Sequence, residues 1–401
     1  MKRLLNILLW SVIAAAFIGP GTITTAARAG SDFRFALAWA LLFSVIACLV
    51  LQEASGRITV VTGKELGQAI RGRFASSSLG ASVPVVAAVG IILGCAAYEA
   101  GNLLGGVAGM RLIVDVSPAL LTLAAGVGAA LLLATGSTRW IARVLGALVA
   151  VMGVAFLVTA IRLGPDLGEL LTGLVVPQIP VGSTVLVLAL IGTTVVPYNL
   201  FLGSALARDN DLGEMRWGLA VAVIGGGIIS LGVLVVGSAL GGGLEYEWLA
   251  TVLGDRLGRG AEASLAIGLF AAGFTSAITA PLAAAITARS LLGEKDDPRW
   301  SEGSLRYRAV WLGVLVTGMA FGIADVRPIP VIILAQAFNG LLLPLIAVFL
   351  RMAMNDRDLL GEAGANSRLQ NLVMGVVVLA CVALGLRGLV AAICGALAML
   401  G

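Results

Sequence analysis

The sequence contains no histidine and few charged residues, and both absences restrict what the chain can be. Histidine is the commonest transition-metal ligand and the usual side chain that titrates near neutral pH. Charged residues make up 12% of the chain, about half of the ~25% found in soluble domains. Hydrophobic residues make up 59%, and the mean hydropathy is +1.03. This composition excludes a soluble protein and indicates an all-α polytopic membrane protein.

Cysteine is scarce, and the four cysteines (Cys48, Cys95, Cys381 and Cys394) all lie inside apolar runs. They are predicted to be buried small hydrophobic side chains, and no Cys-x-x-Cys spacing indicates a zinc site. There is no nucleotide-binding loop and no cluster of metal-ligating residues. We therefore predict no cofactor and no enzymatic activity. The basic residues lie in short loops, so we predict no nucleic-acid partner either.

Apolar runs of roughly 20 residues, the length that crosses a bilayer as a helix, recur along the chain. The N-terminal run resembles a signal peptide but has no Ala-x-Ala cleavage pattern and continues past Gly21, so we interpret it as the first span. A short mixed segment at 61–70 is predicted to be a cytoplasmic helix. About eleven spans are predicted, at 5–30, 35–56, 82–105, 117–136, 140–162, 183–207, 216–241, 262–291, 306–324, 329–351 and 370–398.

The distribution of lysine and arginine predicts the orientation. Placing the N-terminus in the cytoplasm puts 18 of the 26 Lys and Arg residues on the inside, as the positive-inside rule requires. An odd number of spans then places the C-terminus outside. We predict a multi-pass protein of the cell's inner (plasma) membrane.

Two predicted spans are interrupted in mid-membrane. The first contains Gly19-Pro20-Gly21-Thr22, and the sixth contains the segment from Thr193 to Asn199, with Pro197 inside it. Proline removes an amide donor and clashes with the preceding turn, and such breaks are tolerated in lipid only where they are buried or line a cavity. Paired breaks in corresponding spans are typical of inverted-repeat secondary transporters. We predict a first repeat at 1–163, a second at 180–353 and an additional helix at 369–399.

Several segments resemble the Nramp family of divalent-metal transporters. They are GPGTITTAARAG (19–30), LQEASGR (51–57), VTGKEL (61–66), VVPYNLFLGSA (195–205), AGFTSAIT (272–279) and AQAFN (335–339). In this order and at these spacings they cover nearly the whole chain. The resemblance implies a LeuT-like fold with two inverted five-helix repeats and discontinuous helices 1 and 6. It also implies transport by alternating access at a midplane site between these two helices.

The resemblance also shows which site residues this chain lacks. Metal-transporting members of the family bind the ion with a first-helix Asp and Asn and a sixth-helix Met. These positions are Gly19, Thr22 and Val196 here, and the family's sixth-helix His is Tyr198. The predicted substrate-binding residues are Gly19, Thr22, Thr193, Val196, Tyr198, Asn199 and Gln336. No metal ligand is assigned among them.

Loss of the Asp removes the anion that compensates a divalent cation in the membrane, and loss of the Met removes a soft ligand. A hard ion such as Mg²⁺, which keeps its water and prefers oxygen, is favoured if the substrate is a metal. Two alternatives stay open: a transporter of a small non-metal solute on the same fold, and a non-transporting membrane scaffold or sensor.

Glu99 lies in the middle of the third span, where a buried acid is expensive and indicates function. The resemblance places it in the family's proton pathway, whose second acid is Asn102 here. We predict that Glu99 accepts a proton or supplies a displaced countercharge, and the alternative is a structural carboxylate paired with an arginine or hydrogen-bonded to the first span. The predicted partners are therefore a small ion or solute, protons if transport is coupled, and the lipid bilayer. The oligomeric state is not predicted.

Overall fold

The computed structural model describes residues 18–75, 80, 82–135, 139–294 and 297–400. The described residues contain helices and no strands, as the sequence predicts. The bounds are α2 Pro20–Phe33, α3 Ala38–Thr62, α4 Leu66–Phe74, α5 Ser82–Arg111, α6 Pro118–Thr135, α7 Arg139–Leu163, α8 Leu167–Val175, α9 Thr184–Thr194, α10 Pro197–Leu206, η1 Ala207–Asp209, α11 Leu212–Gly237, α12 Tyr246–Leu257, α13 Arg259–Leu292, η2 Pro298–Trp300, α14 Leu305–Ile323, α15 Pro328–Met354, α16 Arg357–Gly364 and α17 Arg368–Leu400.

Nine helical segments within the described residues are long and apolar enough to cross a membrane, and each matches a predicted span. The predicted ninth span is α14, whose first turn contains Arg306 and Arg308 and which is not among the nine. Residues 5–17 of the predicted first span lie outside the described residues, and α2 is its described remainder. The segment predicted as a helix at 61–70 is divided: α3 runs on to Thr62, and α4 begins at Leu66.

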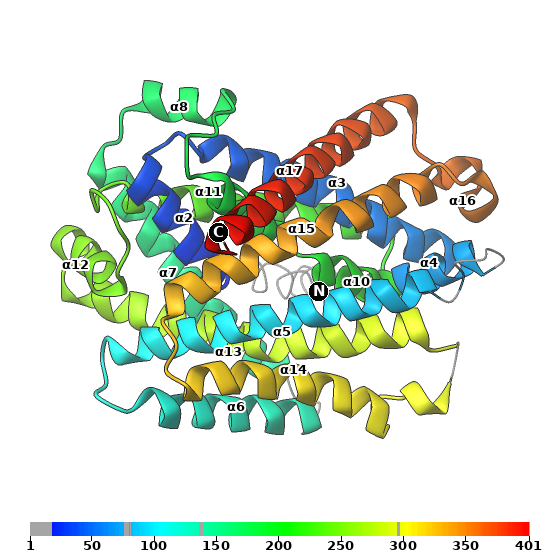
Figure 1. The fold of residues 1–401 in the computed structure, drawn as a ribbon, viewed down its shortest axis with the longest axis horizontal. Helices are drawn as coiled ribbons and strands as arrows, with labels where there is room; N and C mark the ends of the chain where they lie inside the picture. The colour runs from blue at the N-terminus through cyan, green and yellow to red at the C-terminus, as the bar shows by residue number, and fades with distance from the viewer. Residues whose placement is uncertain (1–17, 76–79, 81, 136–138, 295–296, 401) are drawn as a thin grey trace.

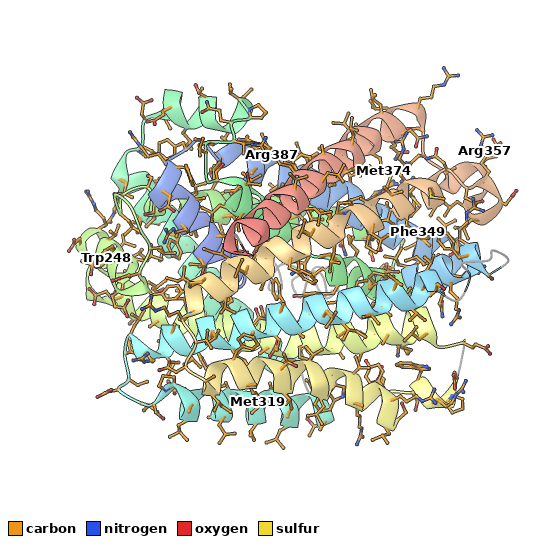
Figure 2. All side chains as sticks on the ribbon, viewed as in Figure 1. Trp248, Met319, Phe349, Arg357, Met374 and Arg387 are labelled. Carbon is orange, nitrogen blue, oxygen red and sulfur yellow. The ribbon has the colours of Figure 1, made fainter. Side chains whose placement is uncertain are left out.

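The long helices run roughly side by side (Figure 1). α5, α13, α14 and α6 form one group. α15 packs against α5, and α17 lies along the other side of α15. Short helices lie at the two ends of the bundle. Figure 2 shows Trp248 of α12 and Arg357, the first residue of α16, at opposite ends. The predicted orientation places the segments that contain α12 and α16 on opposite sides of the membrane.

Small residues allow the helices to approach closely, as in many membrane proteins. A Cβ atom added at Gly192 of α9 would lie 1.9 Å from the Gln336 carbonyl oxygen of α15. A Cβ at Gly237 of α11 would lie 2.2 Å from the Ala27 carbonyl oxygen of α2. These two contacts hold α9 and α2, the helices beside the breaks, against their neighbours.

Replacing Gly192 with alanine is expected to destabilise the protein, because the new methyl group would overlap the α15 backbone. Overpacking of this kind costs about 1–3 kcal/mol, measurable as a lower midpoint of thermal unfolding in detergent. Gly225 of α11 is the matched control, since a Cβ there meets nothing within 4 Å. An equal loss of stability in both alanine variants would contradict this account of the packing.

Candidate functional site

The two helix breaks meet in the interior. α2 begins at Pro20 with Gly19 as its N-cap, and α10 begins at Pro197 with Val196 as its N-cap. Proline is favoured at the first position of a helix because its missing N–H would have no partner there. Across the break, the hydroxyl oxygens of Thr22 and Thr193 are 3.0 Å apart and share a hydrogen bond. The break in the sixth span is confined to residues 195 and 196, because Thr193 and Thr194 are still helical.

Gln336 of α15 approaches the same point. A Cβ atom added at Gly21 would lie 2.2 Å from the Gln336 amide nitrogen and 3.2 Å from the Thr193 hydroxyl oxygen. The close approach of this amide to the first-span backbone therefore requires the glycine at position 21. Thr22, Thr193 and Gln336 are almost completely buried, so the structure brings these three predicted site residues together.

Gly19, which stands where the resembling family has an aspartate, faces polar side chains from other helices. An added Cβ would lie 3.2 Å from the Ser276 hydroxyl of α13 and 3.9 Å from the Tyr98 hydroxyl of α5. The Asn102 side-chain oxygen would be 4.0 Å away. Uncharged oxygen atoms from α5 and α13 thus surround the position that carries the family's carboxylate.

Two tyrosines stand beside this group. The rings of Tyr98 and Tyr198 lie edge to face, with centroids 5.4 Å apart, a favourable arrangement for aromatic pairs. The Tyr98 hydroxyl faces Thr193, Tyr198 and Gln336. It has no partner at full hydrogen-bond geometry within the described part of the chain, nor does the Tyr198 hydroxyl. Tyr98 and Ser276 are not among the residues predicted from the sequence, although Tyr98 precedes Glu99 and Ser276 lies within the motif at 272–279.

Glu99 is completely buried on α5. One carboxylate oxygen accepts a hydrogen bond from the Asn102 amide at 3.4 Å, and the other has no partner among the residues described. Gly318 of α14 packs directly on this side chain: a Cβ there would lie 2.6 Å from the Glu99 Cγ atom. No ion pair joins Glu99 to an arginine within the described ranges, while the alternative of a structural carboxylate hydrogen-bonded to the first span stays a prediction. Asn102 thus links the carboxylate to the surroundings of Gly19.

Several buried polar atoms around the helix breaks have no hydrogen-bond partner in the described structure. Within the described residues, oxygen atoms without a hydrogen-bond partner are found on Tyr98, Glu99, Tyr198, Asn199, Ser276 and Gln336. Buried polar atoms in proteins are normally paired, so a concentration of exceptions calls for water, an ion or a ligand. Val196 contributes its backbone and an apolar side chain rather than a ligand atom. No group of three potential His, Cys, Asp or Glu metal ligands occurs in the described part of the chain.

Hydrogen bonds join α10 to one face of α3. The Gln52 amide donates to the Asn199 carbonyl at 3.0 Å, and the Ser55 hydroxyl donates to the Leu200 carbonyl at 2.6 Å. One turn further on, the Thr59 and Ser204 hydroxyls are 2.6 Å apart. The half-helix after the break is therefore positioned by α3. The remaining predicted site residue, Asn199, keeps its side-chain oxygen free of protein partners in the described structure.

Nearly the whole chain matches a known family. Residues 11–391 match the model for natural resistance-associated macrophage protein-like (Nramp) proteins. The chain belongs to this family. The divalent metal cation transporter MntH of Yersinia pestis (strain Pestoides F) is 25% identical over 375 residues, covering 88% of this chain and 86% of the relative. The MntH transporter of Klebsiella pneumoniae is 26% identical over 303 residues, or 70% and 71% of the two chains. The curated relatives are thus named as transporters rather than enzymes.

Solved structures share the fold. The manganese transporter of Eremococcus coleocola superposes with a TM-score of 0.76 at 20% identity, covering 96% of this chain and 86% of that one. Mhp1, a nucleobase-cation-symport-1 family transporter, gives 0.59 at 15% identity, with 96% and 91% covered. The predicted LeuT-like fold of a multi-pass Nramp protein is confirmed. The repeat boundaries and the orientation of the termini stay predictions.

The hydrogen bond across the break can be tested with isosteric variants. Thr193→Val removes one of its two hydroxyls and is expected to lower the free energy of unfolding by about 1 kcal/mol. Thr194→Val is the control, because the Thr194 hydroxyl bonds only within its own helix, to the Leu190 carbonyl at 3.1 Å. Thermal unfolding of both purified variants measures the difference. Equal stability of the two would contradict a stabilising role for the bond.

Proposed function

We propose that this protein is a secondary transporter that carries a small cation by alternating access at the buried site between α2 and α9–α10. A hard ion such as Mg²⁺ is favoured over a transition metal. The observation that supports this most is the buried Glu99 carboxylate without a basic partner in the described chain, linked through Asn102 to the surroundings of Gly19. An uncompensated charge inside a membrane protein is expensive unless a cation binds there or a proton neutralises it.

The chemistry of the site supports a hydrated hard ion. The polar groups around the break are hydroxyls, amides and one carboxylate, all oxygen donors of the kind that hard cations prefer. The family's thioether position is Val196, so a soft ligand is missing. A hydrated ion also presents water hydrogens to the unpartnered acceptors of Glu99, Asn199 and Gln336. The relatives named as divalent metal cation transporters support a metal substrate in general.

A second candidate is transport of a small organic solute. The edge-to-face pair of Tyr98 and Tyr198, with both hydroxyls unpartnered in the described structure, supports it because such a pair can contact an apolar body and donate hydrogen bonds.

Proton coupling is part of either proposal, with Glu99 as the acceptor. The repeats at 1–163 and 180–353, with the added helix at 369–399, are proposed as the moving parts. The N-terminus is proposed to be cytoplasmic and the C-terminus external.

Uptake by the purified protein in proteoliposomes separates the candidates. We expect Mg²⁺ uptake that exceeds Mn²⁺ uptake, and we expect Glu99→Gln to reduce it at least tenfold because the countercharge is lost. The control is Glu302→Gln, which changes an acid that is 79% exposed at its side chain. Calorimetry without heat for either ion, together with no uptake, would exclude the metal proposal and leave the organic solute. Unchanged proton movement in Glu99→Gln would exclude the proton role.

A gain-of-function variant tests the placement of the site. Combining Gly19→Asp with Val196→Met restores a carboxylate and a thioether at the two break positions, so we expect Mn²⁺ binding that the native chain lacks. Ser276 must shift by a few tenths of an ångström to admit the new Cβ atom. The matched control combines Gly19→Asp with Val195→Met, which moves the sulfur by one residue. A folded Gly19→Asp/Val196→Met protein without calorimetric Mn²⁺ binding would show that the site is misplaced.

A further inference from the structure

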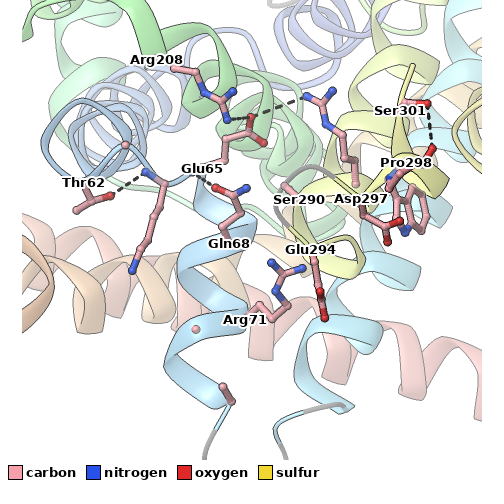
Figure 3. A pocket seen from close by; sticks show the side chains of 16 residues that line it. Thr62, Glu65, Gln68, Arg71, Arg208, Ser290, Glu294, Asp297, Pro298 and Ser301 are labelled. Atoms are coloured by element: carbon pink, nitrogen blue, oxygen red, sulfur yellow. Dashed lines mark hydrogen bonds and ion pairs between the residues drawn. The ribbon is translucent and has the colours of Figure 1, made fainter. Parts of the chain in front are cut away.

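A cavity lies away from the helix breaks, at the end of the bundle that the orientation prediction places in the cytoplasm. Its volume is about 1100 Å³. The walls are the end of α3, helix α4, the residue Arg208 after α10, the end of α13 and the segment at 297–301 (Figure 3). None of the predicted substrate-binding residues lines it.

Two of the acids in the wall are already paired. Glu65, the N-cap of α4, lies 2.8 Å from Arg208 and 3.8 Å from Arg289, and its side chain is only 6% exposed. Asp297 accepts hydrogen bonds from the Arg299 side chain at 2.9 to 3.1 Å. These bonds, with another from the Arg299 backbone, hold the pKa of the Asp297 carboxyl below its usual range. Neither carboxylate is free to receive a cation.

Two of the four bases in the wall are paired: Arg208 and Arg289 both pair with Glu65, and Arg289 also lies 3.6 Å from Glu302 outside the lining. Lys64, Arg71, Arg208 and Arg289 line the cavity against Glu65, Glu294 and Asp297, and Arg299 neutralises Asp297 from outside the lining. The lining thus keeps an excess of positive charge. One guanidinium nitrogen of Arg71, Nη1, is buried and has no hydrogen-bond partner among the described residues. A buried charged donor of this kind is costly unless an acceptor reaches it.

Uncharged polar side chains line the same cavity as Arg71. Gln68, one turn earlier on α4, uses its side-chain oxygen to accept the Glu65 N–H at 2.9 Å. Its amide nitrogen therefore remains available as a donor. Ser290 of α13 is also in the wall, and it lies directly against α4, because a Cβ at Gly67 would be 2.2 Å from the Ser290 hydroxyl oxygen. The Ser290 hydroxyl donates to the Thr287 carbonyl at 3.1 Å within its own helix, so the donors left for a ligand are the Arg71 guanidinium and the Gln68 amide.

We propose that this cavity binds a phosphate-bearing anion, held by Arg71 with the help of Gln68 and Arg289. The planar guanidinium of arginine matches phosphate oxygens with two parallel hydrogen bonds. The source is the headgroup of an anionic phospholipid or a free phosphorylated compound. Basic pockets between membrane helices at the cytoplasmic side are suited to phospholipid headgroups. The bound anion would join α4 to α13 next to the Glu65 ion pairs.

The test uses the full chain purified in detergent and pyrophosphate as the probe, at constant ionic strength set with chloride. Pyrophosphate is expected to raise the midpoint of thermal unfolding. Arg71→Gln is expected to weaken its apparent affinity on the order of tenfold or more, as for loss of a charge-assisted hydrogen bond. Arg73→Gln, a change of an exposed arginine on the same helix outside the cavity, is expected to leave it unchanged. Arg71→Lys, which keeps the charge but not the fork, gives an intermediate loss and replaces Arg71→Gln if that variant does not fold.

Nanodiscs distinguish the two sources of phosphate. In wild-type protein, phosphatidylglycerol in a phosphatidylcholine disc competes with pyrophosphate if the ligand is a lipid headgroup. If phosphatidylglycerol does not compete in such discs and pyrophosphate still binds, the cavity is assigned to a free anion. The proposal is overturned if neither pyrophosphate nor phosphatidylglycerol stabilises the protein. It is also overturned if Arg73→Gln weakens binding as much as Arg71→Gln.

Discussion

The rest of the structure depends on one constraint: in a bilayer, every polar group of the backbone must find its partner inside the protein. Continuous helices meet this requirement by themselves, but the ends of α9, α10 and α2 do not. The chain places both breaks at the centre of the bundle, where turns pair part of the backbone: the Ile23 N–H donates to the Gly19 carbonyl at 3.3 Å, and the Asn199 N–H donates to the Val196 carbonyl at 3.0 Å. Side chains then tie the breaks together, through the hydroxyl pair of Thr22 and Thr193 and the hydrogen bonds from α3 to α10. The surrounding helices must therefore pack closely, which explains the backbone contacts at Gly192 and Gly237.

The same constraint concentrates polarity where a ligand can use it. Because the breaks draw Gln336, Tyr98, Ser276 and Asn199 towards one point, their side chains are removed from water and from lipid together. Donors and acceptors do not balance there, since several oxygen atoms have no partner in the described structure. A fully self-satisfied cluster would stabilise one arrangement of the helices. An unsatisfied cluster instead makes stability depend on what binds, which is the property that a carrier needs if its occupied and empty forms are to differ.

The sequence predicted the helices well because hydropathy and proline positions directly report lipid burial. The break in the first span and the break in the sixth were both located from Pro20 and Pro197, and nine predicted spans correspond to helices long and apolar enough to cross a membrane. The composition of the site was harder to predict. Tyr98 and Ser276 lie on α5 and α13, and nothing in their local sequence shows that these helices meet at Gly19. Gly21 was quoted as part of a motif, but its role as the space for the Gln336 amide depends on a contact between distant helices. The cavity between α4 and α13 was not predicted for the same reason, since its basic residues come together only when these two helices are placed side by side.

The position of the negative charge has consequences for selectivity. A carboxylate at the break would contact a cation directly and could strip its water, whereas Glu99 reaches that region only through Asn102. A carboxylate that does not touch the ion attracts a cation without replacing its bound water, because Coulomb attraction falls slowly with distance while coordination requires contact. Under the function proposed above, such a site would favour ions that keep their water, and it would discriminate little among soft metals that depend on direct ligands. Moving the carboxylate back to position 19, with sulfur at position 196, should therefore change the kind of ion bound as well as its affinity.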